Sequence, residues 1–123
     1  MMTWDEVRTI TDLTWIGGHS HTHPVLSRLS REGLEREIRM CRDRITAETG
    51  GPPTMFAYPN GCPADYTAKT QAVLKRHGFN MAFSTTEDIA GHHTGWMAIR
   101  RIYPVVDSSL ASFVCRLAGL HLL

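Results

Sequence analysis

The chain has 123 residues, of which 42% are hydrophobic and 20% are charged, a composition typical of one globular domain with a modest core. Its 13 basic and 12 acidic residues give a formal net charge of +1, and the lack of a basic block argues against a nucleic-acid partner. The apolar runs are too short for a membrane span. We also expect no signal peptide, because residues 1–10 lack a basic segment followed by an apolar one.

The N-terminal part is predicted to contain a short helix and a strand. Thr3 and Glu6 have the spacing of a capping box, which predicts a helix that ends near Ile10. The apolar run at 13–17 is closed by glycines and predicts a buried strand. A loop rich in histidine follows this run.

A long helix and a second strand are expected next. Ser30 is suited to cap the helix, and the Gly-Gly-Pro-Pro segment at 50–53 ends it. The run 54–58 predicts the strand, and the turn at 59–63 contains a glycine that supplies a positive φ. One face of the helix carries an apolar stripe formed by Leu34, Ile38, Cys41 and Ile45.

The C-terminal part continues the alternation. A helix is expected over 66–77, ended by Gly78, and its inward-facing residues are Ala68, Ala72, Val73 and Leu74. Strands are expected over 80–85 and 97–105, and Asp107 or Ser108 is expected to cap a last amphipathic helix that ends near residue 120. Strands that alternate with helices predict an α/β fold whose four parallel strands form an open sheet.

The three cysteines, Cys41, Cys62 and Cys115, are far apart and form no C-x-x-C pair. An odd number of separated cysteines argues against a disulfide framework and against a cysteine-based zinc site. We therefore predict free, partly buried thiols.

Three of the seven histidines, His19, His21 and His23, lie in the segment GGHSHTHP at 17–24. Imidazole is a common ligand of Zn²⁺ and other divalent metals, and α/β folds bind ligands at the ends of their strands. The two glycines and Pro24 favour a loop or a helix entrance over a metal-binding helix. In an extended loop alternate side chains share one face, so all three could converge on a metal. The alternative is a solvated polar loop.

Three segments, in order, resemble those of a known family. WIGGHSHTHPVLSRLSREGLEREI (15–38) is similar to the segment of polysaccharide deacetylases that carries the H-[ST]-x-x-H-P metal motif. GGPPTMFAYPNG (50–61) is similar to the Phe-Ala-Tyr-Pro-x-Gly variant of the third motif, and the stretch 77–104 is similar to the segment that leads to an Arg-Ile strand. The chain thus resembles the NodB-homology group, carbohydrate esterase family 4, over nearly its whole length.

The resemblance implies a metal site and a substrate groove. By it, His19 and His23 bind one divalent metal ion, expected to be zinc, whereas His21 falls on a position that the family leaves variable. The substrate groove is lined by a turn in which a backbone N–H helps to hold an oxyanion, and its residues here are Tyr58, Pro59, Asn60 and Gly61. From its residues alone, that segment is better explained as an ordinary Asn-Gly turn.

The chain departs from the family at its acid–base residues. The Thr-Phe-Asp-Asp motif, which supplies a metal-binding Asp and the catalytic base, has no counterpart, and Asp5 and Asp12 lie in other contexts. The family's general acid is a His in a Leu-His motif. Here His121 has similar neighbours but is expected at a helix end, and His92 and His93 are loop residues. The base and the acid therefore stay unassigned.

A second departure concerns the arginine that orients the base in many relatives. Ala57 stands at its place, and Arg101, or alternatively Arg100, is a tentative replacement from the fourth strand. Either arginine can equally be a structural or surface residue.

The resemblance implies a single partial deacetylase domain over residues 1–123 with the fold of a partial (β/α) barrel, since a complete barrel takes about 250 residues. The implied function is metal-dependent removal of N-acetyl or O-acetyl groups from a polysaccharide, with hydrolysis of a carbon–nitrogen bond that is not a peptide bond. The alternatives are a non-catalytic remnant that lacks the Asp-Asp motif and another His-x-His metal hydrolase. Relatives often act at the cell envelope or outside the cell, and self-association through open sheet edges is expected.

Overall fold

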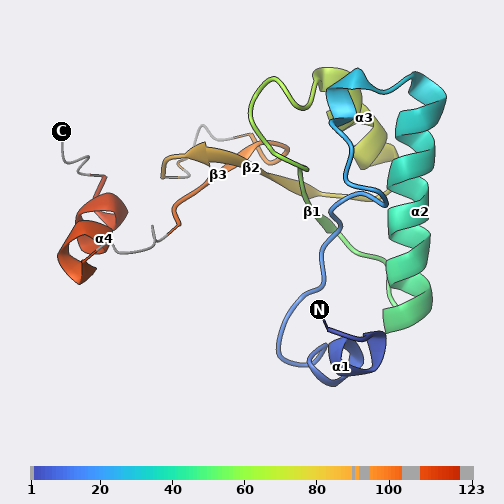
Figure 1. Cartoon of the computed structure of the whole chain (residues 1–123), viewed down its shortest axis with the longest axis horizontal. Helices are drawn as coiled ribbons and strands as arrows, with labels where there is room; N and C mark the ends of the chain where they lie inside the picture. Colours follow the sequence, from blue (N-terminus) through green and yellow to red (C-terminus); the bar gives the residue numbers. More distant parts are fainter. Residues whose placement is uncertain (1, 90, 92–94, 104–108, 120–123) are drawn as a thin grey trace.

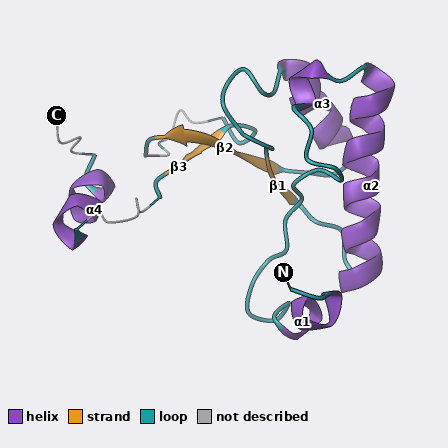
Figure 2. Cartoon of the chain, in the orientation of Figure 1, coloured by secondary structure: helices purple, strands orange, loops and turns teal. Residues whose placement is uncertain are grey.

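Helices and strands alternate along the chain (Figures 1 and 2). The computed structural model describes residues 2–89, 91, 95–103 and 109–119. Its elements are α1 (Trp4–Thr9), the short 3₁₀ helix η1 (Leu26–Arg28), α2 (Arg31–Thr49), β1 (Met55–Ala57), α3 (Ala68–Arg76), β2 (Met81–Glu87), β3 (Ile99–Arg101) and α4 (Leu110–Leu117). The fold is therefore mixed α/β, as expected.

The sheet has three strands in the order β1-β2-β3, and both strand pairs are parallel. Met55 of β1 lies opposite Met81 of β2, and Phe83 of β2 lies opposite Ile99 of β3. Helices α2 and α3 lie together beside this sheet (Figure 1). The described residues thus confirm an open parallel sheet, as expected of part of a barrel, with three strands where four were expected.

The expected strand at 13–17 is wrong. The backbone makes only a single bridge with β1, in which the Gly18 N–H donates to the Met55 carbonyl (2.8 Å) and the Gly18 carbonyl accepts from the Ala57 N–H (2.8 Å). Leu13 and Trp15 are each 84% exposed. Apolar character predicts a buried strand only where another layer covers the run, and no described element covers these two side chains.

The helix caps explain where the first two helices begin and end. Thr3 and Glu6 form the expected capping box of α1, and the Ser30 hydroxyl accepts from the Gly33 N–H at the start of α2. Gly50 ends α2 in the left-handed region, at φ 79°. These boundaries agree with the sequence because capping depends on neighbouring residues alone.

The later helices differ in detail from the expectation. Helix α3 begins after Thr67, and its inward face carries Thr70, Val73 and Leu74, whereas Ala68 and Ala72 are exposed. Thr67 is the N-cap, and its hydroxyl accepts from the Thr70 N–H, so the helix begins later than expected. Helix α4 is capped by Ser109; the expected caps, Asp107 and Ser108, lie outside the described residues.

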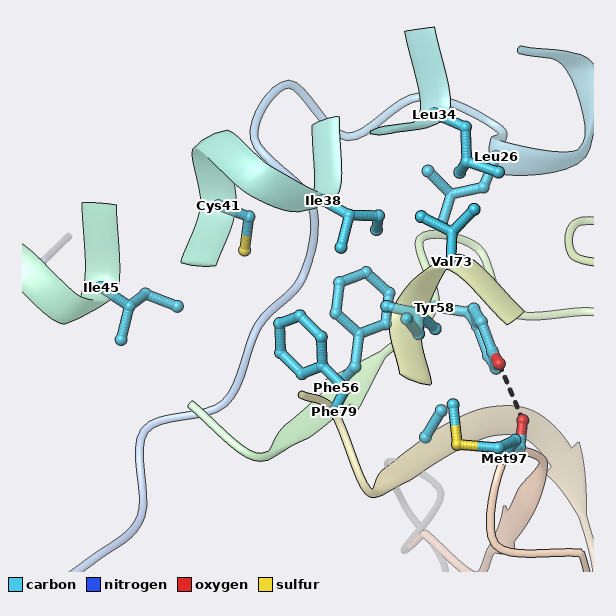
Figure 3. Packing of buried hydrophobic residues seen from close by; sticks show 12 residues of the cluster. Leu26, Leu34, Ile38, Cys41, Ile45, Phe56, Tyr58, Val73, Phe79 and Met97 are labelled. Carbon is cyan, nitrogen blue, oxygen red and sulfur yellow. Dashed lines mark hydrogen bonds between the residues drawn. The ribbon is translucent and has the colours of Figure 1, made fainter. Parts of the chain in front are cut away.

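The hydrophobic core lies between the sheet and helices α2 and α3 (Figure 3). Phe56 of β1 packs edge-to-face against Phe79 and Tyr58, with ring centroids 5.3 and 5.8 Å apart. The Tyr58 hydroxyl donates to the Met97 carbonyl (2.7 Å), so the one polar atom of this aromatic group is satisfied. The core therefore fixes the segment that leaves β1.

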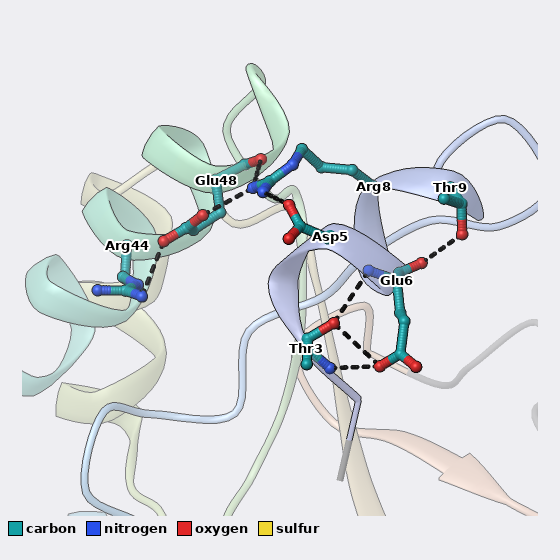
Figure 4. Close-up of polar contacts among 7 residues, drawn as sticks. All are labelled: Thr3, Asp5, Glu6, Arg8, Thr9, Arg44 and Glu48. Carbon is teal, nitrogen blue, oxygen red and sulfur yellow. Dashed lines mark hydrogen bonds and ion pairs between the residues drawn. The ribbon is translucent and has the colours of Figure 1, made fainter.

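Helix α1 contacts the C-terminal end of α2 through an ion pair, drawn in Figure 4, and through a ring contact. Arg8 donates to the Glu48 carboxylate (2.8 Å) and also pairs with Asp5. The Arg44 guanidinium lies 5.4 Å from the centre of the Trp4 ring. These polar contacts each contribute little free energy, and Trp4 of α1 also packs against the hydrophobic core.

The remaining features agree with expectation or extend it. All three cysteines are free, but Cys62 is exposed rather than partly buried.

Helix α4 stands apart from α2 and α3 in Figure 1, and its Arg116 pairs with Glu87 of β2. Among the described residues, no helix is both long enough and apolar enough to cross a membrane.

Candidate functional site

The histidine loop leaves the bridge at Gly18 and brings two imidazoles together. The ring centroids of His19 and His23 are 4.8 Å apart, with an interplanar angle of 70°, and both residues are exposed. The loop is bent, since Ser20 and His23 have φ values of 62° and 60°. An extended arrangement that aligns all three histidines is therefore wrong, because two left-handed residues break the alternation.

His19 is oriented by the end of β1. Its Nδ1 lies 2.8 Å from the Ala57 carbonyl oxygen. A carbonyl oxygen can only accept, so Nδ1 carries the proton and Nε2 presents a lone pair. This is the arrangement by which a backbone carbonyl commonly orients a metal-binding histidine.

Glu37 of α2 holds the apex of the loop, and the sequence analysis missed it. It is 6% exposed and accepts from the backbone N–H groups of His21 (3.0 Å) and Thr22 (2.9 Å) and from the Thr22 hydroxyl (2.7 Å). Burial raises the pKa of Glu37, but these hydrogen bonds outweigh it and hold the pKa below its ordinary value. The available signal was a charged residue on the apolar stripe, between Leu34 and Ile38.

Cys41 supports the other side of the same loop. Burial raises the pKa of its thiol, and the backbone N–H groups of His19 and Ser20 oppose that rise through hydrogen bonds. A Cβ added at Gly18 would lie 3.2 Å from the Cys41 sulfur. Helix α2 therefore lies against the part of the loop from Gly18 to Thr22.

The turn after β1 presents one backbone donor. The Tyr58 N–H donates to the Phe83 carbonyl (3.0 Å), Pro59 has no N–H, and the Gly61 N–H donates to the Pro59 carbonyl (2.7 Å). Within the described part of the chain, the Asn60 N–H has no hydrogen-bond partner. Tyr58 and Pro59 are buried, whereas Asn60 is exposed, at φ 59°. Asn60 is therefore the exposed residue of this turn whose N–H is left unpaired among the described residues.

Gly61 is required by the turn, which gives a stability prediction. Its φ is 79°, and an added Cβ would lie 2.9 Å from Thr85 Cγ2 and 3.0 Å from the Thr85 backbone nitrogen. Gly50 has the same φ and no atom within 4 Å of such a Cβ. We expect Gly50→Ala to cost about 1 kcal/mol through φ alone, and Gly61→Ala to cost about 1–3 kcal/mol more through overpacking. Urea unfolding of both variants measures this difference, and equal losses would contradict the steric argument.

The comparison with known families supplies the decisive observation. The sequence model of the family described as polysaccharide deacetylase matches residues 2–101. The chain belongs to the polysaccharide deacetylase family. No curated protein matches it.

Solved structures of deacetylases share the fold. A Streptococcus pyogenes deacetylase, PplD, in complex with acetate is 20% identical, with a TM-score of 0.83 over 92% of this chain and 49% of that one. A family 4 carbohydrate esterase from Streptomyces lividans in complex with acetate is 26% identical, with a TM-score of 0.59 over 69% of this chain and 43% of that one.

A third structure is a mutant of BA3943, a CE4 family pseudoenzyme with restored enzymatic activity. It is 20% identical, with a TM-score of 0.59 over 70% of this chain and 30% of that one. The chain therefore spans about half, or less, of the length of these three structures.

The two histidines fit part of the metal site that the polysaccharide deacetylase family implies. Two neighbouring imidazoles, one oriented by a carbonyl, match the nitrogen ligands that zinc prefers. Among the described residues, no group of three His, Cys, Asp or Glu side chains could hold a metal ion. The described ligand set is therefore incomplete.

The acid and base candidates do not complete the site within the described structure. Asp5 pairs with Arg8 in α1, and Asp65 accepts from the Cys62 N–H (2.9 Å). Asp12 is exposed in the loop after α1. The other candidates, His92, His93 and His121, lie outside the described residues.

The tentative orienting arginine is held by the sheet. Arg101 donates from Nε to the Ser84 carbonyl (2.7 Å), and Arg100 pairs with Asp88. At the family's arginine position, Ala57 instead contributes its carbonyl to His19. An orienting role for Arg101 stays a prediction.

Proposed function

We propose that this chain carries the two metal-binding histidines and the groove turn of a metal-dependent polysaccharide deacetylase. The observation that carries the proposal is the pairing of His19 and His23, with Nδ1 of His19 tied to the Ala57 carbonyl. Membership of the family supports it. The substrate would be an acetylated glycan, from which N-acetyl or O-acetyl groups are removed.

Each assigned group has a distinct task in this proposal. His19 and His23 hold one divalent ion, expected to be zinc. When bound, such an ion polarises an acetyl carbonyl and lowers the pKa of a water molecule. The Asn60 N–H, which has no hydrogen-bond partner among the described residues, is suited to stabilise the oxyanion that develops on the acetyl oxygen.

Acid–base chemistry needs further groups. A carboxylate must take the proton of the attacking water, and an acid must protonate the leaving amine or hydroxyl. We assign neither group in this chain.

The proposal is tested by release of acetate from an acetylated chito-oligosaccharide, measured with the protein extended upstream of Met1 where the DNA encodes an in-frame Thr-Phe-Asp-Asp segment. The reaction should depend on added divalent metal and on His19 and His23 together. Acetate release that needs neither added metal nor the two histidines would contradict the assignment of His19 and His23 as metal ligands.

A non-catalytic deacetylase-like module is the second candidate. It is favoured by the incomplete ligand set within the described residues and by the structural likeness to a pseudoenzyme of the same family. Such a module would bind glycan or metal without turnover. Family membership favours both candidates over an unrelated His-x-His hydrolase.

We further propose that residues 1–123 form one partial domain that self-associates. Leu13 and Trp15 are exposed beside β1, and α4 exposes an apolar stripe formed by Leu110, Val114 and Leu117. Exposed apolar side chains of this kind favour association.

Light scattering after size exclusion tests self-association. We expect a concentration-dependent mass above that of one chain, reduced in a Leu13→Ser, Trp15→Ser double variant. Trp96→Ser, which changes a side chain that is 69% exposed elsewhere, is the control. A mass that stays at that of one chain at high protein concentration would refute self-association.

A further inference from the structure

We infer that Glu37 is a positioning residue that holds the histidine loop in its metal-ready shape before any ion binds. The inference rests on the proposed metal role of His19 and His23. Glu37 is a buried residue of α2, and among the described residues its carboxylate makes no hydrogen bond to the imidazole of His19 or His23.

The loop requires an anchor because its backbone is strained. Ser20 and His23 both adopt the left-handed region, which residues other than glycine rarely occupy. Such conformations persist only where the surroundings enforce them. Inside the loop, the Ser20 hydroxyl accepts from the His23 N–H (3.0 Å), a contact that moves with the loop and does not fix it to the core.

Glu37 connects the strained loop to the core. Its Oε2 accepts two consecutive backbone N–H groups, those of His21 and Thr22, and its Oε1 accepts the Thr22 hydroxyl. These donors lie between the two histidines in sequence. Hydrogen bonds to a carboxylate are about twice as strong as neutral ones, so this side chain can oppose the strain.

Glu37 is itself held firmly. Its neighbours on α2, Leu34 and Ile38, are 2% and 0% exposed and belong to the core. A rigid support lets a ligand bind without first ordering the loop, which raises affinity. Without Glu37, the metal ion would have to impose the loop shape on binding.

Two substitutions of Glu37 separate its acceptor role from its charge. Glu37→Met keeps the volume but accepts no backbone N–H, and an apolar replacement of a buried charge is often tolerated. Glu37→Gln keeps one oxygen that can accept from the two backbone N–H groups, but it loses the charge and replaces the oxygen that faces the Thr22 hydroxyl with an NH2 donor. The matched control is Glu35→Met on the same helix, because Glu35 binds Arg76 and His77 of α3 and not the loop.

The first measurement is amide hydrogen exchange of the metal-free full chain by NMR. In Glu37→Met, we expect the His21 and Thr22 amides to exchange at least about tenfold faster, since a hydrogen bond to a charged group contributes a factor of that size or more. Glu37→Gln should restore most of the protection. In Glu35→Met, the His21 and Thr22 amides should exchange at the wild-type rate. In Glu37→Met, the Ile38 amide should also exchange at the wild-type rate. Unchanged exchange of His21 and Thr22 in folded Glu37→Met would overturn the inference.

The second measurement is zinc affinity of the same proteins by competition with a chelating dye. We expect Glu37→Met to bind zinc about 10–100-fold more weakly, the usual effect of losing a residue that orients metal ligands. Unchanged zinc affinity in Glu37→Met would also overturn the inference. If the wild-type chain binds no zinc, the proposed metal role fails, while hydrogen exchange still decides whether Glu37 orders the loop.

Discussion

The purified chain should bind a divalent metal ion, and the His19→Ala, His23→Ala double variant should lose it. The physical reason is that the two rings are already adjacent, with the Nε2 lone pair of His19 presented by the contact of Nδ1 with Ala57. Once both imidazoles are removed, the described residues contain no other pair of adjacent histidine rings. Elemental analysis of zinc after dialysis measures the difference. Circular dichroism would verify that the variant is folded.

The control for this prediction is the third histidine of the loop. His21 contributes its backbone N–H to Glu37, and this contact survives a change of side chain. His21→Ala should therefore keep most of the metal content. If His21→Ala lost as much metal as the double variant, His19 and His23 would be the wrong pair. Equal metal content in wild type and in the double variant would refute the site.

The 123-residue chain, assayed alone with metal supplied, should show little or no deacetylase activity. Among the described residues, the two histidines alone give an incomplete coordination sphere, so metal affinity should be lower than in a site with a further carboxylate ligand. A missing general base typically lowers a rate by about 10²–10⁴-fold. Acetate release from an acetylated chito-oligosaccharide measures this rate.

An extended chain provides the comparison. Where the DNA upstream of Met1 encodes an in-frame Thr-Phe-Asp-Asp segment, the extended protein should turn over the same substrate about 10²–10⁴-fold faster than the 123-residue chain. Robust, metal-dependent turnover by the 123-residue chain would contradict the prediction. It would indicate that another carboxylate, for example Asp5, Asp12 or Asp65, acts as the base.

Motifs of the sequence predicted part of the candidate site. The spacing of His19 and His23 and the Asn-Gly turn at Asn60 were readable because each depends on a few adjacent residues. Glu37 was not identified, because a glutamate on a helix is ordinarily solvated and only the packing of α2 against the loop shows that it is buried. The role of the Ala57 carbonyl was equally hidden, since a backbone oxygen carries no residue signature.

The sequence by itself determined the local structure: the capping box at Thr3, the left-handed end of α2 at Gly50, the alternation of helices and strands, and the positive φ of Gly61. Each follows from steric and hydrogen-bonding preferences within a few residues. Tertiary structure alone decided that the run at 13–17 is exposed and makes one bridge, at Gly18. It also decided that the histidine loop bends around a buried carboxylate. Burial depends on which elements meet in space, and residues such as His21 and Glu37, 16 positions apart, meet only when α2 packs beside β1.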